Sequence, residues 1–238
     1  MLVGLFFVIA LCYAAAGFGG GSSYTALLLF RGEDPEVIRM VSLTCNLVVV
    51  GIGGWMSLRS QRVRWKMMAF LLVPSVLGVF QTAGGRVSGP GFESVLGLSL
   101  LVAGLLLLIQ VKERMEERRV SGVVLVILGY GLGLLAGVTG IGGGIYLVPV
   151  LHLLRAGPAK EIAAVGTWFI LVNSAAGLVT IGASQGLGHL RDFGWLPVAV
   201  AVGGLLGANI LQGHLSGPWV RRVTGVLVLV VAVRVLLS

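Results

Sequence analysis

The chain has 238 residues, of which 57% are hydrophobic and only 11% are charged, and its mean hydropathy is +1.02. A water-soluble domain carries about a quarter charged residues to cover its surface, so this composition excludes a soluble globular protein. The net charge of +8 does not indicate a nucleic-acid partner, because the basic residues are scattered between apolar runs. We expect a protein whose surface contacts the lipid bilayer.

Apolar stretches long enough to cross a bilayer, about 17–25 residues each, recur along the whole chain. They cover roughly 2–30, 37–58, 67–83 and 92–111, and then 122–154, 159–182, 194–212 and 219–237. The most charged run of the chain, at 112–119, separates the two sets. We therefore predict two membrane repeats, 1–111 and 122–238, joined by a charged cytoplasmic linker at 112–121.

A glycine-rich run occurs once in each half at the same relative position. Gly17-Phe18-Gly19-Gly20-Gly21 returns 123 residues later as Gly140-Ile141-Gly142-Gly143-Gly144. The same offset relates Pro35 to Pro158, Thr44 to Thr167, Pro74 to Pro197 and Gly84 to Gly207. Gly and Pro are common, so one match would mean little. A series of matches at one offset indicates that a single unit has been duplicated.

The leading apolar element of each half is about 30 residues long, whereas a straight helix needs only about 20 residues to cross the bilayer core. Glycine lets the chain turn sharply, so each element is either a broken spanning helix or a hairpin that enters and leaves on one side. Hairpins place twelve Lys/Arg residues on one side and five on the other, against ten and seven for spanning elements. The positive-inside rule therefore favours hairpins.

A hairpin followed by three spanning helices crosses the membrane an odd number of times, so the second copy is inverted relative to the first. Inverted repeats with broken helices are a common plan of secondary transporters. The predicted fold class is thus all-α and integral to the membrane. It consists of two inverted repeats, each a glycine-broken re-entrant helical hairpin plus three transmembrane helices.

The glycine runs and the polar residues near them are the candidate substrate site. Irregular backbone at membrane depth survives only inside protein or beside a water-filled cavity. A helix that begins after such a break, at Ser22 or Ile145, offers free N–H groups and a positive dipole end to an anion. The candidate substrate-binding residues are Gly19, Gly20, Gly21, Ser22, Ser23, Thr44, Asn46, Thr139, Gly142, Gly143, Gly144, Thr167 and Asn173. The alternative is close helix packing by the glycines and hydrogen bonds from Ser and Thr to their own helices.

Other chemistry has little support in the sequence. Cys12 and Cys45 lie within apolar segments, no Cys/His group has metal-ligand spacing, and no catalytic triad or paired carboxylates lie within the membrane. We therefore expect neither an enzyme nor a cofactor. All nine carboxylates lie in loops or at element ends, so proton coupling through a buried acid is not expected. Uniport of an anion, and a proton carried on the substrate or by a rim group such as Glu93, both stay open.

The two glycine runs resemble those of the TauE/SafE sulfite exporter family of bacterial membrane proteins. Ala14-Ala15-Ala16 precedes the first run and Ala136-Gly137-Val138-Thr139 precedes the second, which is followed by Pro149; the first copy has Ala26 at that position. The resemblance implies transport of a small anion, typically sulfite, sulfoacetate or thiosulfate, across the bacterial inner membrane. We predict a secondary transporter that works by alternating access, with a homodimer as one option for its assembly. An anion channel of the same fold is the alternative.

Overall fold

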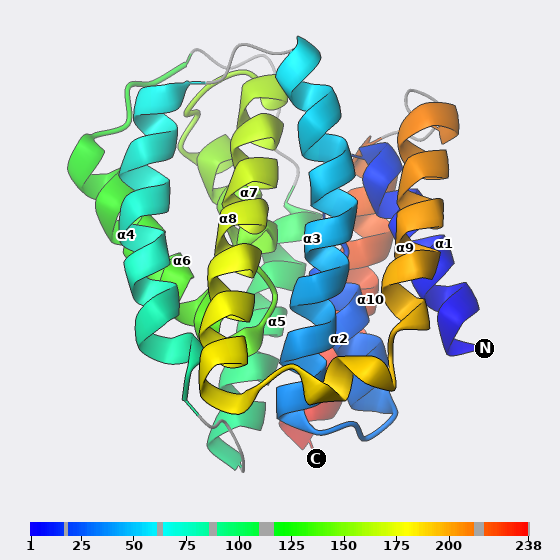
Figure 1. Cartoon of the computed structure of the whole chain (residues 1–238). Coiled ribbons are helices and arrows are strands. Elements are labelled where there is room, and N and C mark those ends of the chain that lie inside the picture. Colours follow the sequence, from blue (N-terminus) through cyan, green and yellow to red (C-terminus); the bar gives the residue numbers. More distant parts are fainter. Residues whose placement is uncertain (17–18, 61–63, 86–89, 110–116, 212–216, 238) are drawn as a thin grey trace.

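The computed structural model describes residues 1–16, 19–60, 64–85, 90–109, 117–211 and 217–237, so 112–116 of the expected linker lie outside the described residues. Within the described residues the fold is entirely helical (Figure 1). The helices are α1 (Leu2–Ala16), α2 (Gly21–Phe30), α3 (Pro35–Ser60), α4 (Trp65–Ala83), α5 (Pro90–Leu108), α6 (Gly122–Thr139), α7 (Gly144–Leu153), α8 (Ala159–Gln185), α9 (Trp195–Leu206) and α10 (Gly217–Leu237). A 3-10 turn, η1 (Gly188–Arg191), follows α8, and a π-helical turn, η2 (Gly207–Leu211), follows α9.

The helices begin and end within a few residues of the apolar stretches expected from the sequence. Each long leading element is two helices, α1 with α2 and α6 with α7, separated at its glycine run. Among the described residues, five helices are long and apolar enough to cross a membrane: α3, α4, α5, α6 and α8. The length and composition of α6, expected as one arm of a hairpin, would therefore also allow it to span a membrane by itself.

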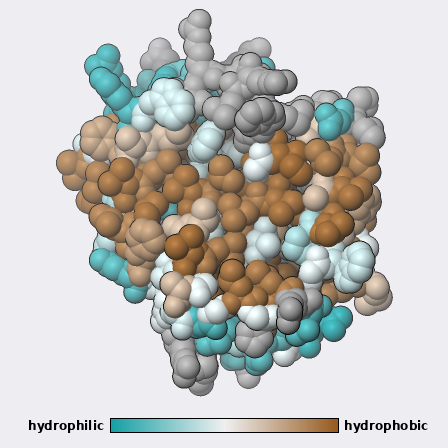
Figure 2. All heavy atoms as spheres, in the orientation of Figure 1, coloured by the Kyte–Doolittle hydropathy of each residue, from teal (hydrophilic) through white to brown (hydrophobic). Residues whose placement is uncertain are grey.

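The helices carry large apolar side chains on their outward faces, as lipid contact requires. Helix α4 exposes Phe70, Val73, Leu77 and Phe80 and buries Ser75 and Gly78. Figure 2 shows the result over the visible face, where apolar residues form a band across the middle and hydrophilic residues lie toward both ends. This distribution, with small and polar residues inward, is that of a multi-pass membrane protein.

Glycines let two pairs of helices approach closely. Gly129, Gly133 and Gly137 of α6 face the carbonyl oxygens of Leu71, Ser75 and Val79 on α4, and a Cβ on any of the three glycines would collide with α4. Gly203 of α9 and Gly207 of η2 face the carbonyl oxygens of Phe7 and Leu11 on α1 in the same way. Such close contacts between small residues hold the helices together, because the hydrophobic effect does not drive helix association in lipid.

The packing of the helices repeats when the two halves are exchanged. Helix α6 packs on α4 of the other half, and α1, its counterpart, packs on α9. Helix α2 packs on α3 as α7 packs on α8, while α3 packs on α8 and α5 on α10 across the two halves. The central helices α3 and α8 run in opposite directions (Figure 1).

The contact between α4 and α6 can be tested with two glycines of the same helix. Gly133→Ala places a methyl group against the Ser75 carbonyl, whereas Gly131 has no atom within 4 Å of an added Cβ. Overpacking costs about 1–3 kcal/mol, so Gly133→Ala should lower the midpoint of thermal unfolding in detergent. Gly131→Ala should leave the midpoint unchanged or raise it, since alanine favours the helix. Equal midpoints for the two variants would contradict this packing.

Candidate functional site

Helices α1 and α2 fold back on each other at the first glycine run. The rings of Phe6 and Tyr24 stack with their centroids 4.6 Å apart, whereas residues 18 positions apart in one straight helix would be separated by about 27 Å. The hydroxyl groups of Tyr13 and Ser23 also form a hydrogen bond of 2.7 Å. The chain therefore reverses direction between Tyr13 and Ser23.

Helices α6 and α7 also return to the end where they started. The Arg118 N–H, before α6, donates to the carbonyl of Arg155, after α7, at 2.9 Å. Arg64, at the start of α4, lies at the same end. Its guanidinium donates to the Ala156 carbonyl at 2.8 Å and pairs with Glu117 at 2.6 Å and Glu161 at 2.7 Å.

The second break needs glycine for its backbone conformation. Gly140 ends α6 with φ +71°, and its N–H donates to the Ala136 carbonyl at 2.9 Å. This is the left-handed cap that glycine adopts most readily. Gly142 and Gly143 also have positive φ, 78° each. Three left-handed residues within four positions reverse the chain, which other residue types would do only with strain.

The first break uses glycine mainly for space. Gly20 has φ −85°, a value open to any residue. A Cβ on Gly20 would come within 2.7 Å of the Tyr24 ring, and a Cβ on Gly21 would collide with the Asn46 amide. Among the described glycines of the two runs, those with positive φ lie in the second run, whereas glycines of both runs leave space for packed neighbours.

The two breaks meet at Asn46 of α3 and Ile170 of α8. The Asn46 Nδ2 donates to the carbonyl of Ile141 in the second break at 3.1 Å. The same side chain lies against Gly19 and Gly21 of the first break, while Ile170 lies against Gly19, Gly142 and Gly144. Four of the predicted site residues, Gly19, Gly21, Asn46 and Gly142, are thus brought together from separate elements.

Several buried polar atoms around this meeting point have no hydrogen-bond partner among the described residues. They are Ser22 Oγ, Tyr24 Oη, Asn46 Oδ1, Asn173 Nδ2 and Ser174 Oγ. Both α2 and α7 begin here without a side-chain cap, and the first N–H groups of a helix have no acceptor within it. Buried polar groups normally find partners, so this cluster is suited to a polar ligand.

The remaining candidates are occupied by other contacts. The hydroxyls of Thr44, Thr139 and Thr167 donate to carbonyls of their own helices, at Met40, Leu135 and Ala163. Ser23 bonds Tyr13, and the Asn173 Oδ1 accepts a hydrogen bond from Ser75 of α4. Gly143 packs against Phe169 and Gly144 against Ile170. In this conformation the three threonine hydroxyls have no free proton to donate to a ligand.

Two residues of the cluster were not among the candidates. Ser174 lies beside Gly142, where an added Cβ would come 2.9 Å from its Oγ, and Tyr24 lies over Gly20. Ile170, Asn173 and Ser174 share one face of α8, because residues three and four positions apart lie on the same side of a helix. This spacing from Asn173 is the sequence signal that could have identified Ser174.

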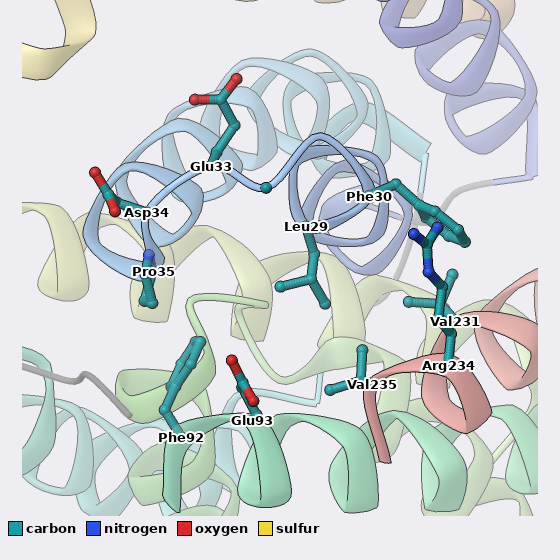
Figure 3. A pocket seen from close by; sticks show the side chains of 11 residues that line it. Leu29, Phe30, Glu33, Asp34, Pro35, Phe92, Glu93, Val231, Arg234 and Val235 are labelled. Atoms are coloured by element: carbon teal, nitrogen blue, oxygen red, sulfur yellow. The ribbon is translucent and has the colours of Figure 1, made fainter. Parts of the chain in front are cut away.

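A cavity of about 350 Å³ lies away from the glycine breaks, between the α2–α3 turn, α5 and α10 (Figure 3). Its charged lining residues are Glu33, Asp34, Glu93 and Arg234. Arg234 stacks over Phe30 with its Cζ 4.3 Å from the ring centroid. Three carboxylates against one guanidinium make this cavity unfavourable for an anion, so the meeting point of the breaks is the better candidate for an anion site.

Comparisons with known proteins identify the family of the chain. The sequence model for the sulfite exporter family TauE/SafE matches residues 2–235. The chain belongs to the TauE/SafE sulfite exporter family. A probable membrane transporter protein of Sinorhizobium fredii is 35% identical, over 97% of this chain and 95% of the relative. No solved structure matches the chain significantly.

A second relative is more distant in sequence. It is a probable membrane transporter protein of Methanocaldococcus jannaschii, 22% identical over 85% of this chain and 79% of the relative. This TauE/SafE chain is therefore a multi-pass membrane transporter, and both glycine runs lie within the matched region.

The need for glycine in the second break can be measured against a matched position. Gly142 and Gly32 both have positive φ, 78° and 73°, but an added Cβ meets Ser174 and Ile170 at Gly142 and nothing within 4 Å at Gly32. Alanine in the left-handed region costs about 1–2 kcal/mol at either site. Overpacking should lower the free energy of unfolding of Gly142→Ala by about 1–3 kcal/mol more than that of the control variant, Gly32→Ala. The midpoint of thermal unfolding of Gly142→Ala should therefore be the lower of the two. Equal losses would show that the breaks are not closely packed.

Proposed function

We propose that this protein is a secondary transporter of a small sulfur-containing oxyanion of the sulfite, sulfoacetate or thiosulfate class. The substrate is held where the two glycine breaks meet and reaches either side by alternating access. The observation that carries the proposal is the convergence of two uncapped helix starts on a cluster of unpartnered buried polar groups. The sulfur class comes from the family, whose description names a sulfite exporter.

The polar groups in and around the first turns of α2 and α7 support an anion as the ligand. Their N–H groups and positive dipole ends favour negative charge, and the unpartnered Ser22, Asn173 and Ser174 side chains add neutral donors. None of the described carboxylates is buried, so none repels an anion from within the core. The same observation supports uniport over coupling through a buried acid.

The burial of the site supports a transporter rather than a channel. Asn46 is fully buried, and Ser22 and Asn173 are nearly so. A conducting channel needs a water-filled path past its selective residues, whereas a transporter passes through a state closed to both sides. The proposed site is closed in this way.

The inverted topology is part of the proposal. It is supported by the opposite directions of α3 and α8 and by the exchange symmetry of the packing. It is also supported by the return of α6 and α7 to the Arg64 end of the molecule. With this end in the cytoplasm, as the positive-inside rule favours, both α1–α2 and α6–α7 are re-entrant hairpins. The bacterial inner membrane and a homodimer remain predictions.

Transport is tested with the purified protein in liposomes. Labelled sulfite, thiosulfate and sulfoacetate should enter by a slow, saturable flux that is absent from empty liposomes, and acetate should not compete. Gly20→Leu and Gly143→Leu should abolish the flux, because the added side chains collide with Tyr24 and Phe169. Gly131→Leu, where no atom lies within 4 Å of an added Cβ, should retain it. Unsaturable, channel-like currents would favour the channel alternative, and no flux of any of the three anions would refute the proposal.

Topology is tested by labelling single cysteines in cells, with Cys12 and Cys45 replaced by alanine. Lys160 is exposed at the start of α8, and Asp192 is exposed in the connection that follows the other end of α8. The inverted arrangement predicts that Lys160→Cys reacts only after the membrane is permeabilised, whereas Asp192→Cys reacts with an impermeant reagent from outside. The reverse pattern would place the Arg64 end of the molecule outside the cytoplasm and contradict the proposed orientation.

A further inference from the structure

Arg39 lies fully buried on α3, within the stretch Pro35–Ile52 that is apolar and long enough to cross a membrane. It is the one charged residue among the buried side chains of the described part of the chain. A charged side chain at such depth is costly and normally has a function. The site described above does not use it.

The guanidinium of Arg39 is bound by backbone rather than by an acid. Its Nη2 donates to the carbonyls of Ala83 and Gly137 at 2.6 and 2.7 Å, and its Nη1 donates to that of Gly85 at 3.1 Å. These carbonyls lie at the C-terminal ends of α4 and α6, which carry partial negative charge. The Nε has no partner, and the ion pairs among the described residues involve Arg31 and Arg64 instead. No described carboxylate forms an ion pair with the guanidinium; Glu36, three residues earlier on α3, acts on the charge only through space.

Arg39 is also close to the glycine breaks. An added Cβ on Gly140 would come 2.7 Å from the Arg39 Cα and 2.9 Å from its Cγ. Asn46 follows Arg39 by seven residues, which places both on one face of α3, about 10 Å apart along the helix axis. The base of the Arg39 side chain thus packs against Gly140 at the start of the second break, and its guanidinium bonds the Gly137 carbonyl three residues before Gly140.

We propose that Arg39 is the fixed positive charge that makes the glycine site selective for anions. This inference rests on the proposed function. Arg39 acts through space on the bound anion, and its hydrogen bonds to the ends of α4 and α6 hold it beside the second break. Charges about 10 Å apart interact appreciably in a protein interior, where the effective dielectric constant is far below that of water. The interaction grows in proportion to the charge of the anion, which a purely structural clamp would not do.

The test compares two tetrahedral anions of different charge in liposomes. Sulfate, with two charges, and methanesulfonate, with one, compete against labelled thiosulfate, and the inhibition constant of each is measured. Arg39→Gln keeps N–H donors but loses the charge, whereas Arg39→Lys keeps the charge. At an effective dielectric constant of about 20, Arg39→Gln should weaken methanesulfonate roughly tenfold and sulfate roughly a hundredfold, and Arg39→Lys should stay close to wild type.

The control removes a different arginine. Arg234 lines the cavity between the α2–α3 turn, α5 and α10, over Phe30, and Arg234→Gln should leave the ratio of the two inhibition constants unchanged. If Arg39→Gln weakens both anions equally or neither, Arg39 is a structural clamp and the inference fails while the proposed function stands. If wild-type liposomes take up none of thiosulfate, sulfite and sulfoacetate, the proposed function fails and the inference fails with it; if they take up only one of the others, that anion serves as the labelled substrate.

A second variant, Arg39→His, tests the same inference if Arg39→Gln does not reach the membrane. Neither sulfate nor methanesulfonate changes its charge between about pH 5.5 and 8, whereas histidine titrates in this range. In Arg39→His the preference for sulfate over methanesulfonate should therefore rise as the pH falls, relative to wild type measured in parallel. A ratio that follows the wild type at every pH overturns the inference.

Discussion

Backbone that leaves a helix inside an apolar environment must find new hydrogen-bond partners, and both glycine breaks depend on this requirement. Asn46 supplies such a partner from the other half of the molecule. Its Nδ2 donates a hydrogen bond to the Ile141 carbonyl of the second break, and the same side chain lies against the first break. A side chain of the first half thereby satisfies a backbone carbonyl of the second half. The contact brings the two breaks to one point, and the remaining polar atoms of the cluster lie around it.

Similar contacts tie the halves together elsewhere in the core. Ser75 of α4 bonds Asn173 of α8, and Arg39 of α3 bonds the ends of α4 and α6. The glycines of α6 and α9 bring backbone against backbone where α6 packs on α4 and α9 packs on α1. Since lipid gives no hydrophobic drive for helix association, these polar and close-packed contacts hold the interior, and the large apolar side chains are free to face the bilayer.

The sequence predicted the helical elements well, because apolar length and glycine interruptions are local properties. It placed both breaks correctly, and four of its candidate residues meet in space. The threonines were less well predicted. Thr44 and Thr167 match at the repeat offset, yet each hydroxyl bonds its own helix, an outcome that a local pattern cannot distinguish from ligand binding. Tyr24 and Ser174 joined the cluster through contacts between segments far apart in the chain.

By itself, the sequence determined that the protein lies in a membrane and that glycine runs interrupt two of its long apolar elements, and it predicts two related halves. These conclusions follow from composition, element length and a constant offset. Only the tertiary structure decided that the two breaks meet at Asn46, that Gly142 and Gly143 need positive φ whereas Gly20 and Gly21 need space, and that Arg39 is buried against Gly140. The reason is physical. Which side chain completes a broken backbone depends on how α3 and α8 pack between the halves, and that packing joins residues about a hundred positions apart in the chain.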